Sequence, residues 1–460
     1  MSLPYLDTFI YSALKYIGNG PGFNGNMGKN PIPDIPVAIA QINHPRGLAA
    51  DYLGNLYFAD EYNGAVRVVT TDISGARVVR TIVGNGIEAG SAEPPNGVFA
   101  HGIELYEPMA VDVSAHCNTV VFTNTDSHLI HMLEMKHPAG VYDRDIYHKG
   151  ALLFPKGTPY PAGPWLTTIA GQYISGSGGG YYQPPDGDPM KARFKYPQGI
   201  AINKNADIIY IADTENHVIR KLAKNMAGDW KIALFAGTPM MAGSSGDGEP
   251  AALARLNMPV GIALDDGEKY LYIADMNNHK VRRIDLLTGI ITTAAGNGMV
   301  PPSQYTNVND GTVIQHGRPL NQVALFKYLS DVALDVNGNI YVADQSQNRI
   351  RKILADLSEI RTIYGDGTTN YIQAPRGIDV NWAGEVFASD TESARIWKLT
   401  PQGLTPDNYP PAPPCRDALT PAKTILSASK AAVGNTLPCG RFEFGLYSEG
   451  GILISTARNY

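Results

Sequence analysis

Residues 196–222 read YPQGIAINKNADIIYIADTENHVIRKL, and residues 258–284 read MPVGIALDDGEKYLYIADMNNHKVRRI. Each stretch contains a Pro-x-Gly-Ile phrase, a turn, an apolar segment that ends in Ala-Asp, and a segment that carries Arg. The same pattern recurs, with more divergence, at residues 44–69, 107–133, 328–353 and 374–399. Self-similarity of this kind is the signature of a repeat architecture in which each copy is one supersecondary unit. The chain therefore contains six units.

Each unit supplies short strands rather than helices. After the Arg segment, five units continue into apolar residues that end in glycine, at residues 80–86, 167–171, 233–237, 291–296 and 361–365. The mixture of alternating and continuous apolar runs is typical of sheets that are covered on both faces. Six units of four strands predict an all-β fold, a six-bladed β-propeller, over residues 1–400.

The sixth unit is one strand short. After residues 395–399 the chain enters TPQGLTPDNYPPAPPC, whose prolines cannot pair within a sheet. Residues 13–20, ALKYIGNG, have the same ending as residues 81–86, TIVGNG. We therefore expect the N-terminal strand to complete the last blade, which closes the ring and removes a mismatched edge.

Two units carry a recognisable motif. Residues 213–220, DTENHVIR, and residues 275–282, DMNNHKVR, resemble the core of the NHL repeat. The connectors SSGDGEPA (244–251) and PDGDP (185–189) resemble the Gly-Asp-Gly segment that precedes the Pro-x-Gly-Ile phrase in many members. The resemblance implies a six-bladed β-propeller. It leaves function open, because propellers of this family serve as binding modules, as lyases and as extracellular scaffolds.

Composition excludes some functions. The chain has 460 residues, of which 44% are hydrophobic, and a net charge of −6. The acidic balance argues against binding to nucleic-acid phosphates, which needs a basic surface. No apolar run approaches the roughly 20 residues of a membrane-spanning helix, and no signal peptide or Asn-x-Ser/Thr acceptor is visible. Cys415 and Cys439 are a candidate disulfide, which needs an oxidising compartment; the alternative is two free thiols.

Three histidines, His128, His217 and His279, occupy one equivalent position in three units. One interpretation is a three-His zinc site like that of the amidating lyases, which the family resemblance implies. The other is that the histidine belongs to the repeat itself, in the turn between the second and third strands. We favour the second, because those turns lie well away from the axis whereas zinc ligands lie about 2.1 Å from one ion. We expect no metal and no cofactor.

Acidic residues also recur in register. They end the second strand of five units, at Asp60, Asp213, Asp275, Asp344 and Asp390, and Asn124 replaces them in the divergent unit. We interpret them as structural acceptors of backbone N–H groups in the following turn. Connector residues Asp186, Asp188, Asp247 and Asp310 are the candidates for calcium, but they lack the ligand spacing of a known calcium loop, which favours ordinary surface turns.

The residues that open the first strands are predicted to face the axis where the connectors converge. We predict that ligand-binding residues at this axial entrance are Arg46, Gln198, Asp331 and Arg376, and we identify no catalytic residue. Units six and one are neighbours in a closed ring, so Arg376 and Arg46 are expected side by side, as an anion or carboxylate site. The alternative is that each arginine pairs with Asp379 or a neighbouring carbonyl.

Residues 401–460 are a Pro-rich linker and a tail with two possible strands, residues 442–446 and 452–454. Two short strands cannot form a core of their own, so we expect them to dock on the propeller or on another chain. Docking on another chain would make a homo-oligomer or a filament.

The sequence favours a non-enzymatic binding or assembly module. Its propeller loops would meet a protein or polysaccharide partner, in an extracellular or cell-surface setting rather than the cytoplasm. The alternative is a propeller enzyme of the amidating-lyase or lactonase kind that acts in an axial pocket.

Overall fold

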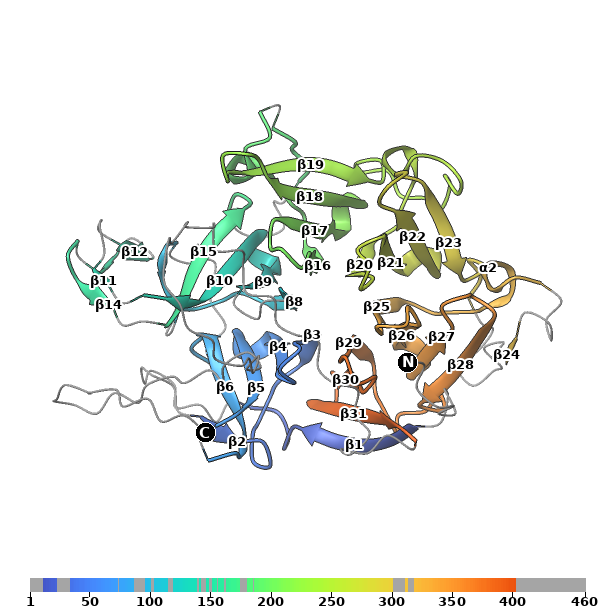
Figure 1. Cartoon of the computed structure of the whole chain (residues 1–460), viewed down its shortest axis with the longest axis horizontal. Coiled ribbons are helices and arrows are strands. Elements are labelled where there is room, and N and C mark those ends of the chain that lie inside the picture. The colour runs from blue at the N-terminus through green and yellow to red at the C-terminus, as the bar shows by residue number, and fades with distance from the viewer. Residues whose placement is uncertain are drawn as a thin grey trace, which may run out of the picture.

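Six blades surround a central axis in the computed structural model (Figure 1). The structure describes residues 11–402 except for 23–33, 73, 87–95, 101–102, 115–118, 139, 142–145, 149–150, 155, 161–162, 174–179, 185, 301–310 and 313–317. The predicted tail strands and all three cysteines lie outside the described residues. Within that description, no helix has the length and apolarity needed to cross a membrane.

Each blade is an antiparallel sheet whose first strand lies nearest the axis. The first strands are β3 (Pro45–Ala50), β8 (Pro108–Val113), β16 (Pro197–Ile202), β20 (Pro259–Leu264), β25 (Leu329–Leu334) and β29 (Pro375–Val380). The second strands are β4 (Leu56–Asp60), β9 (Thr119–Asn124), β17 (Ile208–Asp213), β21 (Tyr270–Asp275), β26 (Ile340–Asp344) and β30 (Val386–Asp390).

The third and fourth strands complete the blades. The third strands are β5 (Ala65–Thr71), β10 (Leu129–His137), β18 (Val218–Lys224), β22 (Lys280–Asp285), β27 (Arg349–Ile353) and β31 (Arg395–Pro401). The fourth strands are β6 (Arg77–Gly84), β15 (Gly163–Ala170), β19 (Trp230–Ala236), β23 (Ile291–Ala295), β28 (Glu359–Tyr364) and β1 (Tyr11–Ile17). The expectation of six four-stranded blades is confirmed.

The glycine of the Pro-x-Gly phrase lets neighbouring first strands approach closely. A Cβ atom on Gly199 would lie 2.0 Å from the carbonyl oxygen of Val260, and one on Gly377 would lie 2.0 Å from that of Arg46. Both oxygens belong to the next blade around the ring. A side chain at either position would therefore push two blades apart.

The N-terminal strand closes the ring as predicted. Strand β1 pairs antiparallel with β31, from Tyr11 opposite Pro401 to Ile17 opposite Ile396. Gly18 follows β1 with a φ of +107°, and a Cβ there would lie 2.3 Å from the carbonyl oxygen of Ala394. The glycine that ends each other fourth strand has the same left-handed backbone and the same kind of contact. The ending shared by residues 13–20 and 81–86 therefore marks one structural position.

Buried carboxylates hold the start of each blade against its second strand. In the third blade, Asp213 accepts hydrogen bonds from the backbone N–H of Lys195 at 2.8 Å and from the side chain of Asn216 at 2.9 Å. Its other oxygen lies 3.3 Å from Nη1 of Arg220, and both side chains are fully buried. Burial raises the pKa of Asp213 to about 6, while the charge of Arg220 acts in the opposite direction.

The same set of contacts recurs around the ring. Asp60 accepts from the N–H of Asn43 and from Asn63, and forms an ion pair with Arg67 at 3.0 Å. Asp275 accepts from the N–H of Asn257 and forms an ion pair with Arg282 at 3.4 Å. These acids are structural, as predicted. The prediction of their backbone donor was wrong. The carboxylates accept a backbone N–H from the segment before the first strand, whereas the backbone N–H that ends the following turn bonds to a carbonyl of that same turn.

Two blades replace the arginine and keep the acceptor. In the second blade, Asn124 accepts from the N–H of Tyr106 and contacts Nε2 of His131 at 3.3 Å. Burial lowers the pKa of His131 to about 3, so that ring is neutral. In the sixth blade, Trp397 donates to Asp390 at 3.0 Å. The second blade has therefore exchanged a buried ion pair for two neutral groups, which leaves no unpaired charge in the core.

The repeated histidines join one blade to the next. His217 and its counterparts follow the turn between second and third strands with a left-handed backbone, and accept an N–H from the next connector. His128 accepts from Tyr196 at 3.3 Å, His217 from Met258 at 3.1 Å, and His279 from Tyr328 at 3.4 Å. Asn348 does the same for Ala374. Each histidine thus serves a different blade interface, as expected of a residue that belongs to the repeat.

We predict that removal of residues 1–20 destabilises the whole ring. The deletion removes β1 with its buried Ile17 and exposes the edge of β31. The melting temperature should fall by about 5 °C or more, with aggregation on heating. Differential scanning calorimetry checks this, with deletion of residues 1–9 as the control that keeps β1. Equal melting of both deletions and the full chain would contradict the closure.

We also predict that Arg220→Ala lowers the free energy of unfolding by about 3–5 kcal/mol, because it leaves the buried charge of Asp213 unpaired. Arg220→His alone should be similarly harmful. The double variant Asp213→Asn/Arg220→His copies the pair in the second blade and should lose less than Arg220→His. Urea unfolding measures all three. A double variant that is less stable than Arg220→His would show that Asn and His cannot replace the ion pair of the third blade.

Candidate functional site

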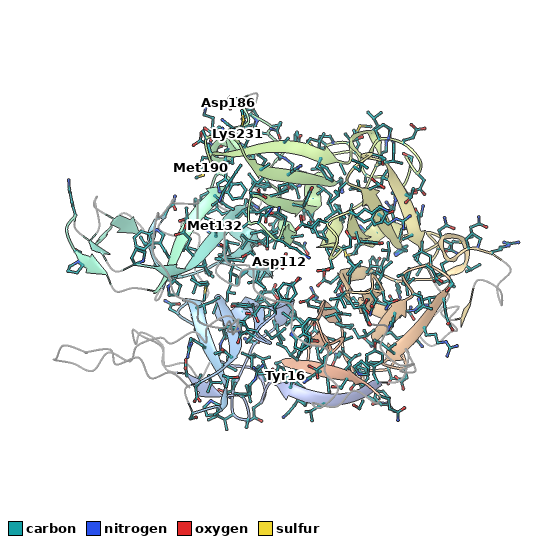
Figure 2. The ribbon with its side chains drawn as sticks, in the orientation of Figure 1. Tyr16, Asp112, Met132, Asp186, Met190 and Lys231 are labelled. Atoms are coloured by element: carbon teal, nitrogen blue, oxygen red, sulfur yellow. The ribbon has the colours of Figure 1, made fainter. Side chains whose placement is uncertain are left out.

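The first strands enclose an axial cavity of about 560 Å³. All six blades contribute to its wall, and Asp112 lies near the centre of the ring whereas Tyr16 lies at the rim (Figure 2). Polar and charged side chains gather at three levels: at the mouth where the connectors converge, in the middle, and at the mouth formed by the turns between first and second strands. Each level offers different chemistry.

Two arginines occupy the connector mouth. Arg46 opens β3 and Arg376 opens β29, and both line the cavity. The charge of Arg46 adds to desolvation in lowering the pKa of Arg376, as two nearby cations do. Their side chains are 15% and 25% exposed, so both are largely desolvated and still reachable. Both arginines thus line the same cavity, and each acts electrostatically on the other.

The arginines differ in how well they are compensated. Nη2 of Arg46 lies 2.6 Å from Oε1 of Glu61, a buried carboxylate that His44 also contacts at 2.6 Å. Nη2 of Arg376 lies 3.9 Å from Oε1 of Glu392, whose side chain is 42% exposed. Neither arginine pairs with Asp379, as the alternative had proposed, because that carboxyl accepts the N–H of Ala50. Arg376 therefore holds the weaker ion pair and is the more available cation.

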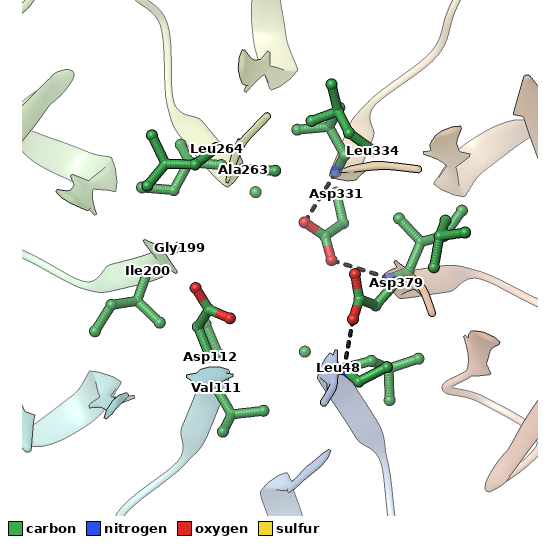
Figure 3. Close-up of a pocket in the computed structure, with 18 of the residues that line it drawn as sticks. Leu48, Val111, Asp112, Gly199, Ile200, Ala263, Leu264, Asp331, Leu334 and Asp379 are labelled. Atoms are coloured by element: carbon green, nitrogen blue, oxygen red, sulfur yellow. Dashed lines mark hydrogen bonds between the residues drawn. The ribbon is translucent and has the colours of Figure 1, made fainter. Parts of the chain in front are cut away.

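Three carboxyls point into the middle of the cavity (Figure 3). Asp112 accepts the N–H of Ile202 in the next blade at 2.8 Å, and Asp331 accepts that of Ile378 at 3.0 Å. Asp379 accepts the N–H of Ala50 at 2.5 Å across the closure of the ring. These bonds tie blades two to three, five to six and six to one. The second oxygen of Asp112 and of Asp331 accepts the N–H of the next residue, Val113 at 2.7 Å and Val332 at 2.9 Å, and all three carboxyls line the cavity.

Desolvation dominates the protonation of these carboxyls. It raises the pKa of Asp112 and of Asp331 to about 7 and that of Asp379 to about 8. The accepted N–H bonds oppose the shift, whereas mutual repulsion adds to it for Asp331 and Asp379. All three carboxyls therefore titrate near neutral pH, and the charge of Asp112 raises the pKa of the other two.

The second mouth is bridged by side chains. The hydroxyl of Tyr52 in the first blade donates to Asp266 in the fourth at 3.3 Å, and Nζ of Lys204 lies 2.7 Å from the same carboxylate. The first and fourth blades stand opposite each other in the ring. This contact spans the cavity, so the connector mouth is the more open approach.

The predicted entrance residues all line the cavity. Arg46, Gln198 and Arg376 lie at the connector mouth, while Asp331 belongs to the central cluster. Sequence reasoning did not select Asp112 or Asp379 as axial groups. The available signal was their register, because both stand where four other first strands have alanine: Ala49, Ala201, Ala263 and Ala333.

The connector acids have protein partners. Asp186 accepts from Nζ of Lys191 at 2.8 Å, Asp188 from the N–H of Met190, and Asp247 from Arg282 and Thr293. Asp310 lies outside the described residues. Among described residues, no three His, Cys, Asp or Glu side chains lie close enough to hold one metal ion. Asp186 and Asp188 thus act as turn residues, and Asp247 pairs with the buried Arg282.

Comparison with known proteins agrees with the fold. The model of the NHL repeat family matches residues 194–222, which span most of the first three strands of the third blade. A chicken protein, NHL repeat-containing protein 2, is 25% identical over 316 residues, or 68% of this chain and 39% of that protein. Protein SUPPRESSOR OF QUENCHING 1, chloroplastic, from Arabidopsis thaliana is 26% identical over 47% of this chain and 21% of that protein.

The chain thus spans well under half the length of these two relatives. Among solved structures, a structural-genomics protein of unknown function from Bacteroides thetaiotaomicron superposes with a TM-score of 0.52 at 15% identity, over 85% of this chain and 76% of that one. A likeness at this identity concerns the fold. The prediction of an NHL-type six-bladed β-propeller is confirmed.

We predict that the axial carboxyls make stability fall as pH rises through neutrality. Their pKa values in the folded chain exceed the value of about 3.9 in the unfolded chain, so the folded protein retains protons that the unfolded one releases. The associated stability is complete below about pH 4 and is lost by about pH 8, at up to about 1.4 kcal/mol per pH unit for each group.

Urea unfolding between pH 5 and 8 checks this. Asp379→Asn should flatten the loss of stability with pH, whereas Asp229→Asn, at an exposed turn, should leave it as in the wild type. A slope that is unchanged in Asp379→Asn would contradict the raised pKa of Asp379.

Proposed function

We propose that this NHL-repeat propeller is a non-enzymatic binding module whose connector mouth receives a carboxylate of a protein or acidic polysaccharide partner. The observation that carries the proposal is the pair of guanidiniums, Arg46 and Arg376, at the open end of a cavity of about 560 Å³. Two adjacent cations with planar donor faces suit a carboxylate, which can accept bidentate hydrogen bonds from both.

The weak ion pair of Arg376 explains how a ligand would enter. Glu392 is 42% exposed and stands 3.9 Å from the guanidinium, beyond hydrogen-bond distance. An incoming carboxylate can therefore replace Glu392 with little loss. Arg46 would keep Glu61, which is buried and holds its guanidinium in place at 2.6 Å. The site thus has one fixed and one available cation.

Aromatic side chains flank the arginines. Tyr62 is 44% exposed and stacks on His44 with ring centroids 4.2 Å apart, and Tyr328, which lines the cavity, is 42% exposed. Tyrosine and arginine are the residue types that contribute most to protein interfaces, and exposed aromatic rings also stack on sugar rings. A rim of this composition favours a macromolecular partner over a small buried ligand.

An axial enzyme is the second candidate. The cluster of Asp112, Asp331 and Asp379, with pKa values of about 7 to 8, has the protonation that general acid–base catalysis at neutral pH requires. Against it, each carboxyl accepts the N–H of a neighbouring blade and so already has a structural role. This candidate requires turnover that is lost in Asp379→Asn while ligand binding is retained.

We predict that Arg376→Gln weakens binding of carboxylate probes at least about tenfold, which corresponds to loss of one charge-assisted hydrogen bond. The probes are oligogalacturonate and an acidic peptide with a free C-terminus, each measured by isothermal titration calorimetry. The methyl-esterified oligosaccharide and the amidated peptide should bind no better than Arg376→Gln binds the free acids.

Arg395→Gln is the matched control, because Arg395 is an exposed arginine of the same blade outside the cavity wall. It should bind the probes as the wild type does. Equal affinity of Arg376→Gln and Arg395→Gln, or no binding of either probe by the wild type, would count against the proposal.

A further inference from the structure

Extra segments cover the outer edges of five blades. In three of them the cover is a short strand: β2 (Ile35–Pro36) on β6, β7 (Val98–Phe99) on β15, and β24 (Gly311–Thr312) on β28. In the third blade, the N–H of Ile232 in β19 donates to the carbonyl of Gly187 at 2.8 Å. In the fourth, Ile291 of β23 exchanges two hydrogen bonds with Gly248 and Glu249. The fold thus repeatedly adds backbone partners to its fourth strands.

The sixth blade is the exception among the described residues. Strand β1 is its outer strand and pairs with β31 alone. Residues 12–15 are exposed, and the side chain of Leu14 is 66% exposed. An open strand edge beside an exposed leucine is a template for one more strand, which would satisfy the outward-facing N–H and C=O groups.

We propose that residues 442–446 of this chain add to β1 as a fifth, antiparallel strand. These residues read FEFGL, so apolar side chains alternate with a charge and a glycine, which is the pattern of a half-buried strand. In β1, YSALKYI, alternation puts Leu14 and Lys15 on opposite faces. Tyr16 lies at a bulge in the pairing with β31, and its ring is on the face of Leu14, because Nζ of Lys398, the partner of Leu14, lies 5.9 Å from the centroid of that ring.

One register matches both faces. With Leu14 opposite Phe444, an antiparallel pairing puts Tyr16 opposite Phe442 on the apolar face. The same pairing puts Lys15 opposite Glu443 on the other face. Cross-strand aromatic pairs and opposite charges each stabilise a sheet by about 0.2–1 kcal/mol. Gly445 falls opposite Ala13, where no bulk is needed.

The position of the linker favours the tail of the same molecule. Strand β31 ends at Pro401, which is paired with Tyr11 at the start of β1. The last described strand therefore ends beside the start of β1, one strand away from the open edge. A coil as long as residues 402–441 spans roughly 35 Å on average, whereas β1 is about 23 Å long. A tether of this kind gives an effective concentration in the millimolar range, above any working concentration of a second chain.

Hydrogen–deuterium exchange of the full chain tests the proposal. The amides of residues 442–446 should exchange at least about tenfold more slowly than in a free peptide of residues 436–450. Lys15→Glu should reduce this protection, and the double variant Lys15→Glu/Glu443→Lys should restore it. Light scattering of the same samples should show a monomer, and the melting temperature of each variant confirms that the propeller is folded.

Three results would overturn the proposal. Residues 442–446 that exchange at the rate of the free peptide would mean that no strand forms. Protection that appears with rising concentration, together with a larger mass, would place the tail on a second molecule. Protection in both charge variants equal to that of the wild type would exclude the pairing of Lys15 with Glu443.

Discussion

The ring depends on backbone amides that precede the first strands. One amide binds its own blade in all six units, and in four units the next amide binds the preceding blade. In the third blade, the N–H of Lys195 binds Asp213 of the same blade, and the N–H of Tyr196 binds His128 of the blade before it. One short segment is therefore fixed to its own sheet and to its neighbour at once. The left-handed backbone of Tyr196, with a φ of 49°, turns the two amides toward different acceptors. Buried amides without such partners would each destabilise the fold by about 1–3 kcal/mol.

This arrangement explains why many polar residues of the repeat serve the fold and are not available for binding or catalysis. Aspartate, asparagine and arginine at the second and third strands satisfy each other inside the blade, and the histidine satisfies the next connector. The axial cavity is different, because its polar residues differ from blade to blade. Arg46 and Arg376 are such departures at the mouth, and Asp112, Asp331 and Asp379 are such departures in the middle. The proposed function rests on the positions where the repeats disagree.

Much of the architecture was predictable from the sequence, and for a physical reason. The glycine that ends each fourth strand must adopt a left-handed backbone against a carbonyl, so its recurrence at Gly18 revealed the closing strand. The donor to Asp213 was not predictable in the same way, because Lys195 lies upstream of two strands and meets the carboxylate once the sheet has formed. Asp112 and Asp379 could have been selected from their register, because both stand where the other first strands have alanine. That their carboxyls point into one cavity is seen in the structure (Figure 3).

Native-state hydrogen exchange measured by NMR tests the central claim most directly. The amides that donate to the buried acceptors, those of Asn43, Tyr106, Lys195, Asn257, Lys327 and Gln373, lie outside the strands. If the carboxylates and the asparagine fix each connector to its own blade, these connector amides exchange as slowly as the amides of the central strands, through global unfolding. Exchange at the rate of other connector amides would show that these buried acceptors do not fix the connectors.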